Sequence, residues 1–271
     1  MLRLVKFAVI AYLATAVSAG ASSLDEIQGP VAVMEVCSYT ANDSSGQVVK
    51  TLTGRSKVFY DANLNPVEAF SYDPSGVILE HRVCKYDKDG RLLEVVVFDG
   101  NGSFLEKIIV THHENTIIYE DYDAKHNLLR ETREEYDESG KLIEATVTYF
   151  NYSYFLNGEV CWPFEEWLFH YGPDGTLREV VYYDFLHQIP LTEVQEFFYN
   201  VESMDLIIKT TRSCWWISDK PLHLYFRGEK IISSDRYGNW TEKHVFDKKE
   251  RSPGVTDWVL VEVYKRIFWY R

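Results

Sequence analysis

The chain has 271 residues, of which 46% are hydrophobic, 15% aromatic and 25% charged. This apolar content can build a folded core, so a disordered chain is excluded, and the length suits one large domain or two small ones. The 28 Lys and Arg residues stand against 41 Asp and Glu residues, which gives a net charge of −13. Such an acidic chain is expected to repel nucleic acid and anionic membranes rather than bind them.

The first predicted element is a signal peptide over residues 1–21. Arg3 and Lys6 form a basic head, residues 7–17 form an apolar run, and small residues follow up to Ala21. This is the layout of a cleavable secretory signal, with the cut after Ala19 or Ala21. A retained membrane anchor is the alternative, but the apolar run is shorter than the roughly 20 residues that a spanning helix needs. We therefore expect an exported protein, periplasmic or extracellular, whose mature chain of residues 22–271 has a net charge of −15 and does not span a membrane.

Export places the cysteines where disulfides persist. The four cysteines are widely spread and include no Cys-x-x-Cys motif: Cys37, Cys84, Cys161 and Cys214. Four cysteines allow three pairings, and the sequence does not choose among them. Buried free thiols are the alternative.

From residue 60 onward the chain repeats a short pattern. An aromatic residue precedes an Asp, and a Gly, an apolar residue and a Glu follow the Asp at three, five and seven residues. Four segments fill every position: Tyr72–Glu80, Tyr86–Glu94, Phe98–Glu106 and Tyr136–Glu144. Weaker copies begin at Tyr60, Tyr122, Tyr171 and Ser234.

The chemistry of the pattern predicts a turn followed by a strand. Asp is favoured at the first position of a type I turn, and Gly at the fourth supplies the left-handed residue of a bulged hairpin loop. The residues between the turns are rich in Val, Ile, Leu, Tyr and Phe and are long enough for strands of about 8–10 residues. The unit is therefore one turn plus one strand.

The hairpin loops also predict which residues face each other. The expected aromatic pairs are Tyr86 with Leu92, Phe98 with Phe104, and Tyr136 with Leu142. The same rule places Glu68 opposite Arg82 and Glu134 opposite Glu144; the second pair is unfavourable without a nearby cation.

The spacing of the repeats predicts the two faces of the sheet. The origins at Asp61, Asp73, Asp87 and Asp99 are 12, 14 and 12 residues apart. Strand side chains alternate with period two, so even spacing predicts that each position keeps to one face. On this basis Leu93, Val95 and Val97 share one face, and Leu92, Val96 and Phe98 share the other. Both faces are partly apolar, which favours an all-β antiparallel meander of hairpins that is curled or folded over, in a single elongated domain over 22–271.

The pattern resembles the YD repeat, the module of RHS-type proteins. The segment Asp235–Lys243 is similar to the last copy in small exported bacterial YD-repeat proteins, and Val263–Tyr270 is similar to their final strand. The resemblance covers roughly residues 55–150, 165–185 and 230–271. Large family members enclose a toxin in a shell of many repeats, but this chain has too few copies for that role.

Two stretches depart from the pattern and are rich in aromatic residues. They are residues 151–170, with Tyr152, Tyr154, Cys161, Trp162, Phe164, Trp167 and Phe169, and residues 186–233, with Phe197, Phe198, Tyr199, Trp215 and Trp216. Non-repeated loops on a regular scaffold are where binding residues concentrate. Aromatic enrichment is equally what a sheet core requires, so these stretches are either core or a binding surface.

No constellation in the sequence predicts catalysis or a cofactor. His112-His113-Glu114 has metal ligands, but adjacent strand residues point to opposite faces. The Asp-rich turns resemble calcium loops but lack the Glu and the helices of an EF-hand. The repeated Glu residues recur with the pattern, whereas a catalytic carboxylate pair is singular. We therefore predict no catalytic residue, no metal site and no cofactor.

The predicted function is a non-catalytic binding or structural module of the cell envelope or extracellular space, with a protein or glycan partner. The alternative is a secreted hydrolase acting on carbohydrate, in which residues 151–170 and 186–233 line a cleft with two close carboxylates. An outer-membrane barrel is disfavoured because charges fall on both faces of the strands, as at Arg130, Glu131, Arg133 and Glu134.

Overall fold

The computed structural model describes residues 27–44, 47–150, 154–156, 159–185, 191–201, 204–213, 223–252 and 255–270. The predicted signal peptide lies outside these ranges, as do Cys214 and the side chain of Cys161. Cys37 and Cys84 are free thiols. In the part of the chain that the structure describes, no helix is long and apolar enough to cross a membrane.

The predicted all-β antiparallel meander is confirmed. The strands are β1 (Val31–Ser44), β2 (Gln47–Tyr60), β3 (Pro66–Tyr72), β4 (Ile78–Tyr86), β5 (Leu92–Asp99), β6 (Phe104–His112), β7 (Thr116–Asp123), β8 (Leu128–Tyr136), β9 (Leu142–Tyr149), β10 (Tyr154–Leu156), β11 (Glu159–Cys161), β12 (Phe164–Tyr171), β13 (Leu177–Asp184), β14 (Leu191–Val201), β15 (Met204–Ser213), β16 (His223–Ser234), β17 (Trp240–Ser252) and β18 (Val255–Tyr270).

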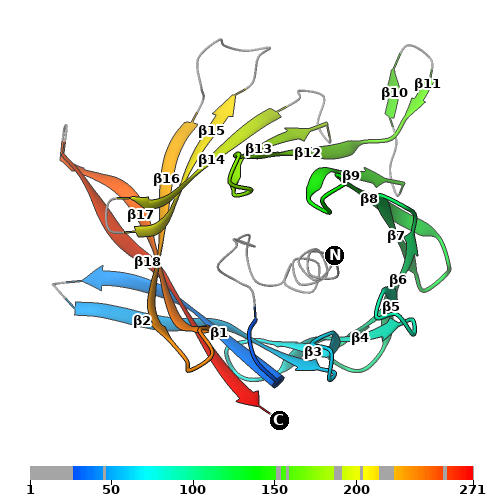
Figure 1. The fold of residues 1–271 in the computed structure, drawn as a ribbon, viewed down its shortest axis with the longest axis horizontal. Coiled ribbons are helices and arrows are strands. Elements are labelled where there is room, and N and C mark those ends of the chain that lie inside the picture. The colour runs from blue at the N-terminus through cyan, green and yellow to red at the C-terminus, as the bar shows by residue number, and fades with distance from the viewer. Residues whose placement is uncertain are drawn as a thin grey trace. The chain divides into compact units, whose positions relative to one another are not determined.

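The main sheet follows the chain order from β1 to β9 and from β12 to β18. Because β1 also pairs with β18, the strands of the main sheet are hydrogen-bonded in the order of a closed barrel. This arrangement is more specific than the predicted curled or folded-over sheet. β10 and β11 form a separate two-stranded sheet. In Figure 1 the first strands, in blue, lie beside β17 and β18, in orange and red.

The residues group into two compact units. Of the described residues, those within 27–105, 204–205 and 227–270 form the terminal unit, and those within 106–201 and 206–226 form the central unit. A single domain over residues 22–271 stays a prediction.

The turn chemistry of the repeat is confirmed. In the copy at Asp87, the amide of Gly90 donates to the carbonyl of Asp87 at 3.1 Å, and Gly90 has a φ of +79°. The Asp87 carboxylate accepts the amides of Asp89 and Arg91, both at 2.9 Å. Turns with the same backbone hydrogen bond begin at Asp61, Asp73, Asp99, Asp123, Asp137, Gly172 and Asp235.

The prediction that each position keeps to one face is wrong. Tyr86 faces Leu92 on the side of the sheet that carries the buried Cys84 and Val95, whereas Tyr72, one copy earlier, lies on the opposite side. The reason is a register shift of one residue beside the turn, as at Lys85/Tyr86. Such a bulge adds one residue to one strand and reverses the alternation at every hairpin. We call the side with the buried residues the core face and the other the open face.

Bulges of this kind, one in each hairpin, correct three further predictions. Leu92, with 2% of its surface exposed, shares the core face with Val95 and Val97, and Leu93 is 43% exposed. Glu68 faces Val83 instead of Arg82. Between β8 and β9, Glu134 faces Ala145, and Glu135 takes the place opposite Glu144.

The pairs directly beside the turns hold where their register is described. Tyr86 faces Leu92 and Tyr136 faces Leu142, as predicted. The rings of Phe98 and Phe104 lie 6.3 Å apart at 86°, so this predicted aromatic pair is in contact. The like-charged pair of Glu135 and Glu144 is relieved by Arg133, whose Nη2 lies 2.9 Å from Glu135.

The core cluster of the terminal unit explains why β1, β17 and β18 associate. Its buried members are Val31, Met34, Val36, Tyr60, Trp240, Val245 and Tyr264. They come from the first two strands and from β17 and β18, so burial of apolar surface joins the two ends of the chain.

Candidate functional site

The open face of the terminal unit carries rows of aromatic and basic side chains across neighbouring strands. Residues directly opposite each other share a face. The central row contains Ile267, Glu35, Lys57, Phe70, His81 and Phe98. The row on one side of it contains Glu242, Lys265, Cys37, Arg55 and Tyr72. The row on the other side contains Trp269, Val33 and Phe59. We call this set, together with Lys50, the aromatic–basic face.

Its rings form a continuous ladder over β2–β5. Phe70 stacks on His81 with ring centroids 4.3 Å apart and planes 1° apart, and His81 lies 5.6 Å from Phe98. Phe59 meets Phe70 edge to face at 6.1 Å. Contacts of this kind add about 0.5–1.5 kcal/mol per pair beyond the area they bury, so the ladder stiffens this face.

Cations lie over the rings at the margin of the ladder. Lys57 Nζ is 5.2 Å from the Phe59 centroid and 5.5 Å from that of Trp269, which holds the ammonium group between two rings. The Arg55 guanidinium lies 4.6 Å from the Tyr72 centroid. Cation–π contacts of this kind position a charge without neutralising it.

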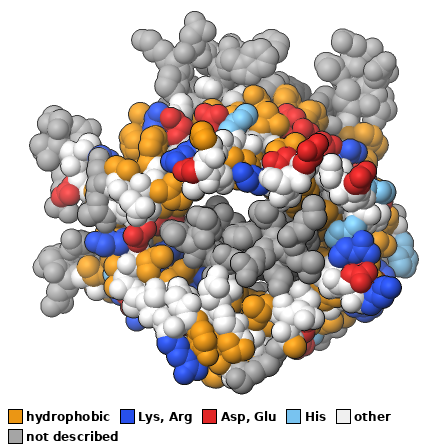
Figure 2. Space-filling model, viewed as in Figure 1, with side chains coloured by type: hydrophobic (Ala, Val, Ile, Leu, Met, Phe, Trp, Pro, Cys, Tyr) orange, Lys and Arg blue, Asp and Glu red, His pale blue; other side chains and the backbone are white. Residues whose placement is uncertain are grey.

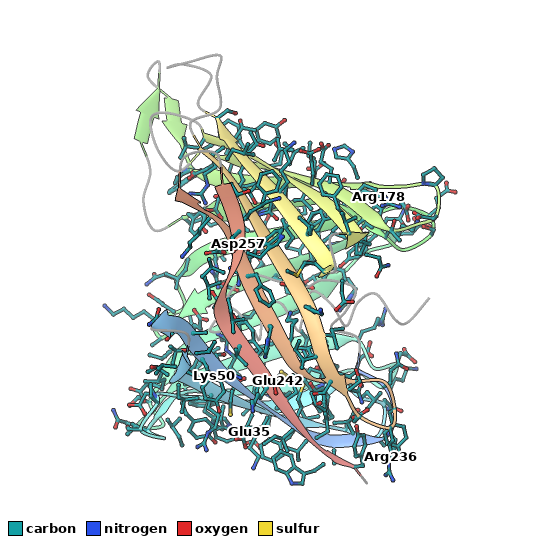
Figure 3. The ribbon with its side chains drawn as sticks, turned by 90° about the vertical axis from the view of Figure 1, so that its left-hand side faces the viewer. Glu35, Lys50, Arg178, Arg236, Glu242 and Asp257 are labelled. Carbon is teal, nitrogen blue, oxygen red and sulfur yellow. The ribbon has the colours of Figure 1, made fainter. Side chains whose placement is uncertain are left out.

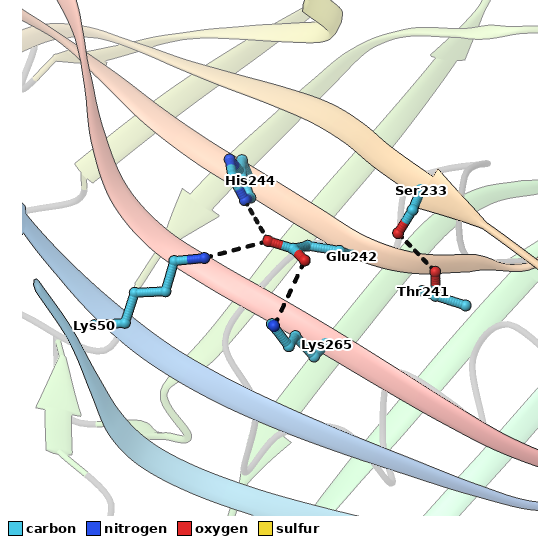
Figure 4. Close-up of polar contacts among 6 residues, drawn as sticks. All are labelled: Lys50, Ser233, Thr241, Glu242, His244 and Lys265. Carbon is cyan, nitrogen blue, oxygen red and sulfur yellow. Dashed lines mark hydrogen bonds and ion pairs between the residues drawn. The ribbon is translucent and has the colours of Figure 1, made fainter. Parts of the chain in front are cut away.

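One carboxylate on this face gathers three nitrogen groups (Figures 3 and 4). Glu242 Oε1 lies 2.7 Å from His244 Nε2 and 3.2 Å from Lys50 Nζ, and its Oε2 lies 3.6 Å from Lys265 Nζ. The hydrogen bond with His244, followed by the contacts with the two lysines, lowers the pKa of Glu242 to about 2. Glu242 is therefore ionised under physiological conditions, and two lysines surround one negative charge.

The central unit has a different, acidic open face. Glutamates lie directly opposite each other in three cross-strand pairs: Glu120 with Glu131, Glu135 with Glu144, and Glu179 with Glu196. In Figure 2 acidic side chains are frequent over the part of the view where Figure 1 places β9, β12 and β13. Burial and the charge of Glu144 raise the pKa of Glu166 on the same face. The basic side chains of the aromatic–basic face therefore stand out in an acidic chain.

The core face of the central unit contains carboxylates held by tyrosines. Glu134 accepts hydrogen bonds from Tyr119 at 3.0 Å and Tyr136 at 2.7 Å, and burial raises its pKa despite these two donors. Glu165 accepts hydrogen bonds from Tyr149 at 3.1 Å and Tyr182 at 2.8 Å. A carboxyl group with a raised pKa is a feature of general acids, so Glu134 has one property that an enzyme could use.

The structure does not gather the cluster His112-His113-Glu114, which has the residue types of a metal site but was not predicted to be one, around a common point. His112 ends β6, while His113 and Glu114 lie in the turn before β7. Among the described residues, no group of three or more His, Cys, Asp or Glu side chains is placed to hold a metal ion. The Asp residues of the calcium-like loops instead accept backbone amides, as Asp99 does from Asn101 at 2.9 Å and Ser103 at 2.8 Å.

The repeated Glu residues are divided between the faces. Glu80 accepts a hydrogen bond from Arg82 on the core face, and Glu94 accepts one from Lys85 at 2.6 Å on the open face. They do not converge, because the bulges send successive copies to opposite sides.

The aromatic departures are in part packing residues. Phe164 and Phe185 stack at 4.4 Å, and Trp167 lies 5.0 Å from Tyr182. Trp162 remains 41% exposed and contacts Phe150 at 5.5 Å. Tyr152, Trp215 and Trp216 lie outside the described residues, as does the side chain of Tyr154.

The aromatic–basic face was not predicted from the sequence. Tyr72 and Phe98 stand at repeat positions, but the common face of these rings with Lys57 and His81 depends on bulges and on the pairing of β1 with β18. The signal that could have found it is the spacing over 55–59, where Ser56 and Val58 separate Arg55, Lys57 and Phe59, so that a strand presents these three residues to one side.

Comparison with known proteins shows the fold and no family. No family model and no curated protein matches the chain. A porin-like protein from Bacteroides uniformis is 10% identical, with a TM-score of 0.50, over 89% of this chain and 98% of that protein. A chain from a complex of TcdB2, TccC3 and Cdc42 is 11% identical with a TM-score of 0.18, over 83% of this chain and 16% of that one, and supports no inference. The chain thus shares the β-sheet architecture of a porin-like protein.

Proposed function

We propose that this chain is an exported, non-catalytic β-sheet protein of the YD-repeat type that binds a glycan of the cell envelope through its aromatic–basic face. The observation that carries the proposal is the ladder of Phe59, Phe70, His81 and Phe98, flanked by Lys57 and Arg55. The Asp residues of the repeats serve the turns, which leaves the open faces of the strands for recognition.

The chemistry of this face suits a sugar chain. Trp269 is 43% exposed and Phe104 is 37% exposed, so ring surface is available beside the ladder. Rings pack against the C–H faces of a sugar, while carboxylate, guanidinium and ammonium groups hydrogen-bond its hydroxyls. A few polar groups among aromatic side chains are the usual composition of a binding site.

A location outside the lipid is part of the proposal. On the open face, Lys85 and Glu94 form an ion pair in the terminal unit, and Arg133 and Glu135 form one in the central unit. Charged side chains on a lipid-facing strand destabilise a membrane barrel by about 2–4 kcal/mol for Arg or Lys at the midplane. Although the chain shares its fold with a porin-like protein, the charged side chains of its open face favour contact with water over contact with lipid.

The binding proposal is tested by co-sedimentation of the mature protein with insoluble cell-wall glycan and by titration with soluble envelope polysaccharides. Phe70→Ala and Trp269→Ala are expected to weaken binding at least tenfold. Phe198→Ala is the matched control, because Phe198 is 40% exposed and belongs to the central unit, not to the aromatic–basic face. Equal binding by all three variants, or no binding to any glycan, contradicts the proposal.

The location is tested separately by extracting the expressed protein without detergent. We expect the protein in the aqueous fraction, folded by circular dichroism. Recovery in detergent alone supports a membrane-embedded barrel instead.

A secreted hydrolase is the second candidate, favoured by the raised pKa of Glu134 and by Glu165 lying directly opposite Asp184 on β13. It is tested with a panel of carbohydrate substrates. Turnover by the parent protein that Glu134→Gln or Glu165→Gln abolishes without unfolding establishes the hydrolase and overturns the non-catalytic proposal.

A further inference from the structure

We propose that residues Ile27–Pro30 form a strap that docks on the β16–β17 turn and holds β1 and β18 together. β1 and β18 are the first and last strands, and they pair over Val31–Thr40 and Glu262–Tyr270. No chain connection joins them, unlike the hairpins on either side. We call this pairing the seam.

The buried side chain of Asn239 is the centre of the strap contact. Asn239 is 2% exposed. Its Oδ1 accepts the Gln28 amide at 2.5 Å, and its Nδ2 lies 2.8 Å from the Gln28 carbonyl oxygen. The Asn239 side chain thus hydrogen-bonds both the backbone N–H and the backbone C=O of Gln28, as a neighbouring strand would.

The same side chain also ties the strap to the end of β18. Nδ2 of Asn239 lies 3.0 Å from the hydroxyl of Tyr270 and 3.1 Å from the Asp235 carboxylate. Tyr270 itself donates a hydrogen bond to Asp235. Gln28, the turn and the last strand are therefore connected through one buried polar cluster.

Gly29 fits the strap under an aromatic ring. It has a φ of +81°, and a Cβ there would lie 2.8 Å from the ring of Tyr237. The Tyr237 ring lies 4.6 Å from that of Tyr270, and the Arg236 guanidinium lies over both at 4.9 and 5.6 Å. No residue with a side chain fits this position without displacing Tyr237.

The contact of Asn239 with the strap is additional to the hydrogen bond that an Asn makes within other turns of the repeat. Asn127 occupies the same position after Asp123 and donates to its carboxylate at 2.8 Å, but Asn127 is exposed. Asn239 makes the equivalent contact with Asp235 and in addition holds Gln28. The strap therefore uses a turn of the repeat to bind a segment 211 residues away in the sequence.

The docked strap is expected to hinder the separation of β1 from β18 at the seam. Ile27 packs against the core cluster at one end of the strap, and the amide of Val31 donates to the carbonyl of Gly29 at 3.0 Å at the other. Separating β1 from β18 requires the strap to leave Asn239 and Tyr237.

The proposal is tested by hydrogen exchange of the mature chain. Asn239→Ala is expected to accelerate exchange of the β1 and β18 amides at the seam at least tenfold, while β4 and β5 keep the parent rates. Asn127→Ala removes the same turn contact without a strap and is the control. Equal exchange at the seam in the two variants overturns the proposal.

A second pair of variants keeps the test independent of Asn239. Gly29→Ala and Gly102→Ala impose the same backbone strain, because both glycines have a φ of +81°, but a Cβ at Gly102 meets nothing within 4 Å. We expect faster exchange at the seam in Gly29→Ala alone. Should Gly29→Ala fail to fold, Tyr270→Phe, which removes one hydroxyl of the cluster, is measured instead; parent exchange rates at the seam in that variant also overturn the proposal.

Discussion

The hydroxyl of Tyr86 donates a 2.7 Å hydrogen bond to the backbone carbonyl of Pro66. Pro66 stands five residues after Asp61, in the β2–β3 hairpin, whose turn comes two turns before the one introduced by Tyr86 and lies at the same end of the meander. In the central unit Tyr171 makes the equivalent bond, at 3.0 Å, to Leu142, five residues after Asp137. In these two copies the tyrosine hydroxyl thus clamps the hairpin next to it at the same end of the sheet.

Removing this hydroxyl tests the clamp. Tyr86→Phe is expected to lower the free energy of unfolding by about 1–3 kcal/mol, because the buried Pro66 carbonyl is left without its donor. The measurement is urea denaturation followed by tryptophan fluorescence. Tyr72→Phe, on the open face, is the control and should change stability by less than about 0.5 kcal/mol. Equal losses in both variants contradict the clamp.

The turn aspartates predict a loss of stability in acid. Hydrogen bonds from Thr176 lower the pKa of Asp174 to about 2, and hydrogen bonds from Arg91 and Ser75 hold the pKa of Asp87 and Asp73, respectively, below the usual range. A carboxyl group with a depressed folded pKa stabilises the fold above its unfolded pKa of about 3.9, and this contribution is lost as the pH falls through the folded value.

We therefore expect the thermal unfolding midpoint to drop between about pH 4 and pH 2. Asp174→Asn is expected to be less stable than the parent at pH 7, with the difference shrinking toward pH 2. If the stability difference between the parent and Asp174→Asn stays constant over this pH range, the charge of Asp174 does not contribute to stability.

The left-handed turn position predicts opposite effects of two substitutions. His126 has a φ of 62°, so His126→Gly relieves a non-glycine residue in this region and should raise stability by about 1 kcal/mol. Gly140 has a φ of +80°, and a Cβ at this position would meet nothing within 4 Å, so Gly140→Ala should cost about 1 kcal/mol from strain alone. Thermal unfolding of both variants checks the signs; destabilisation by His126→Gly is the contrary result.

The ion pair of Lys243 and Glu229 predicts a non-additive pair of substitutions. The two side chains are 7% and 3% exposed, and their charged atoms lie 3.1 Å apart. Glu229→Gln leaves the Lys243 ammonium buried without its carboxylate, which should cost about 3–5 kcal/mol. The double variant Glu229→Leu with Lys243→Met should cost less than the single one, because no charge is left buried.

The exposed pair of Lys85 and Glu94 is the comparison for this cycle. Lys85 is 63% exposed in its side chain, so Glu94→Gln should cost less than about 1 kcal/mol. Chemical denaturation of these variants beside the parent protein gives the cost of breaking each pair. A buried pair that behaves like the exposed one refutes the assignment of a large desolvation penalty to Lys243.

The local structure of this protein could be predicted from its residues alone. The Asp and Gly of each repeat specify the turn through contacts within five residues, as from Asp87 to Gly90 and Arg91, and the β-branched and aromatic residues between the turns specify strands. The meander of hairpins and the pairs beside the turns, such as Tyr86 with Leu92, follow from these local rules.

Which side chains share a face, and how the ends of the chain meet, became known from the folded sheet. Each bulge shifts the alternation by one residue, so Tyr72 and Tyr86 lie on opposite faces although their spacing is even. The pairing of β1 with β18 and the hold of Asn239 on Gln28 join residues more than 200 positions apart. Contacts of that range depend on the burial and hydrogen bonding of the whole sheet, which no local pattern in the sequence encodes.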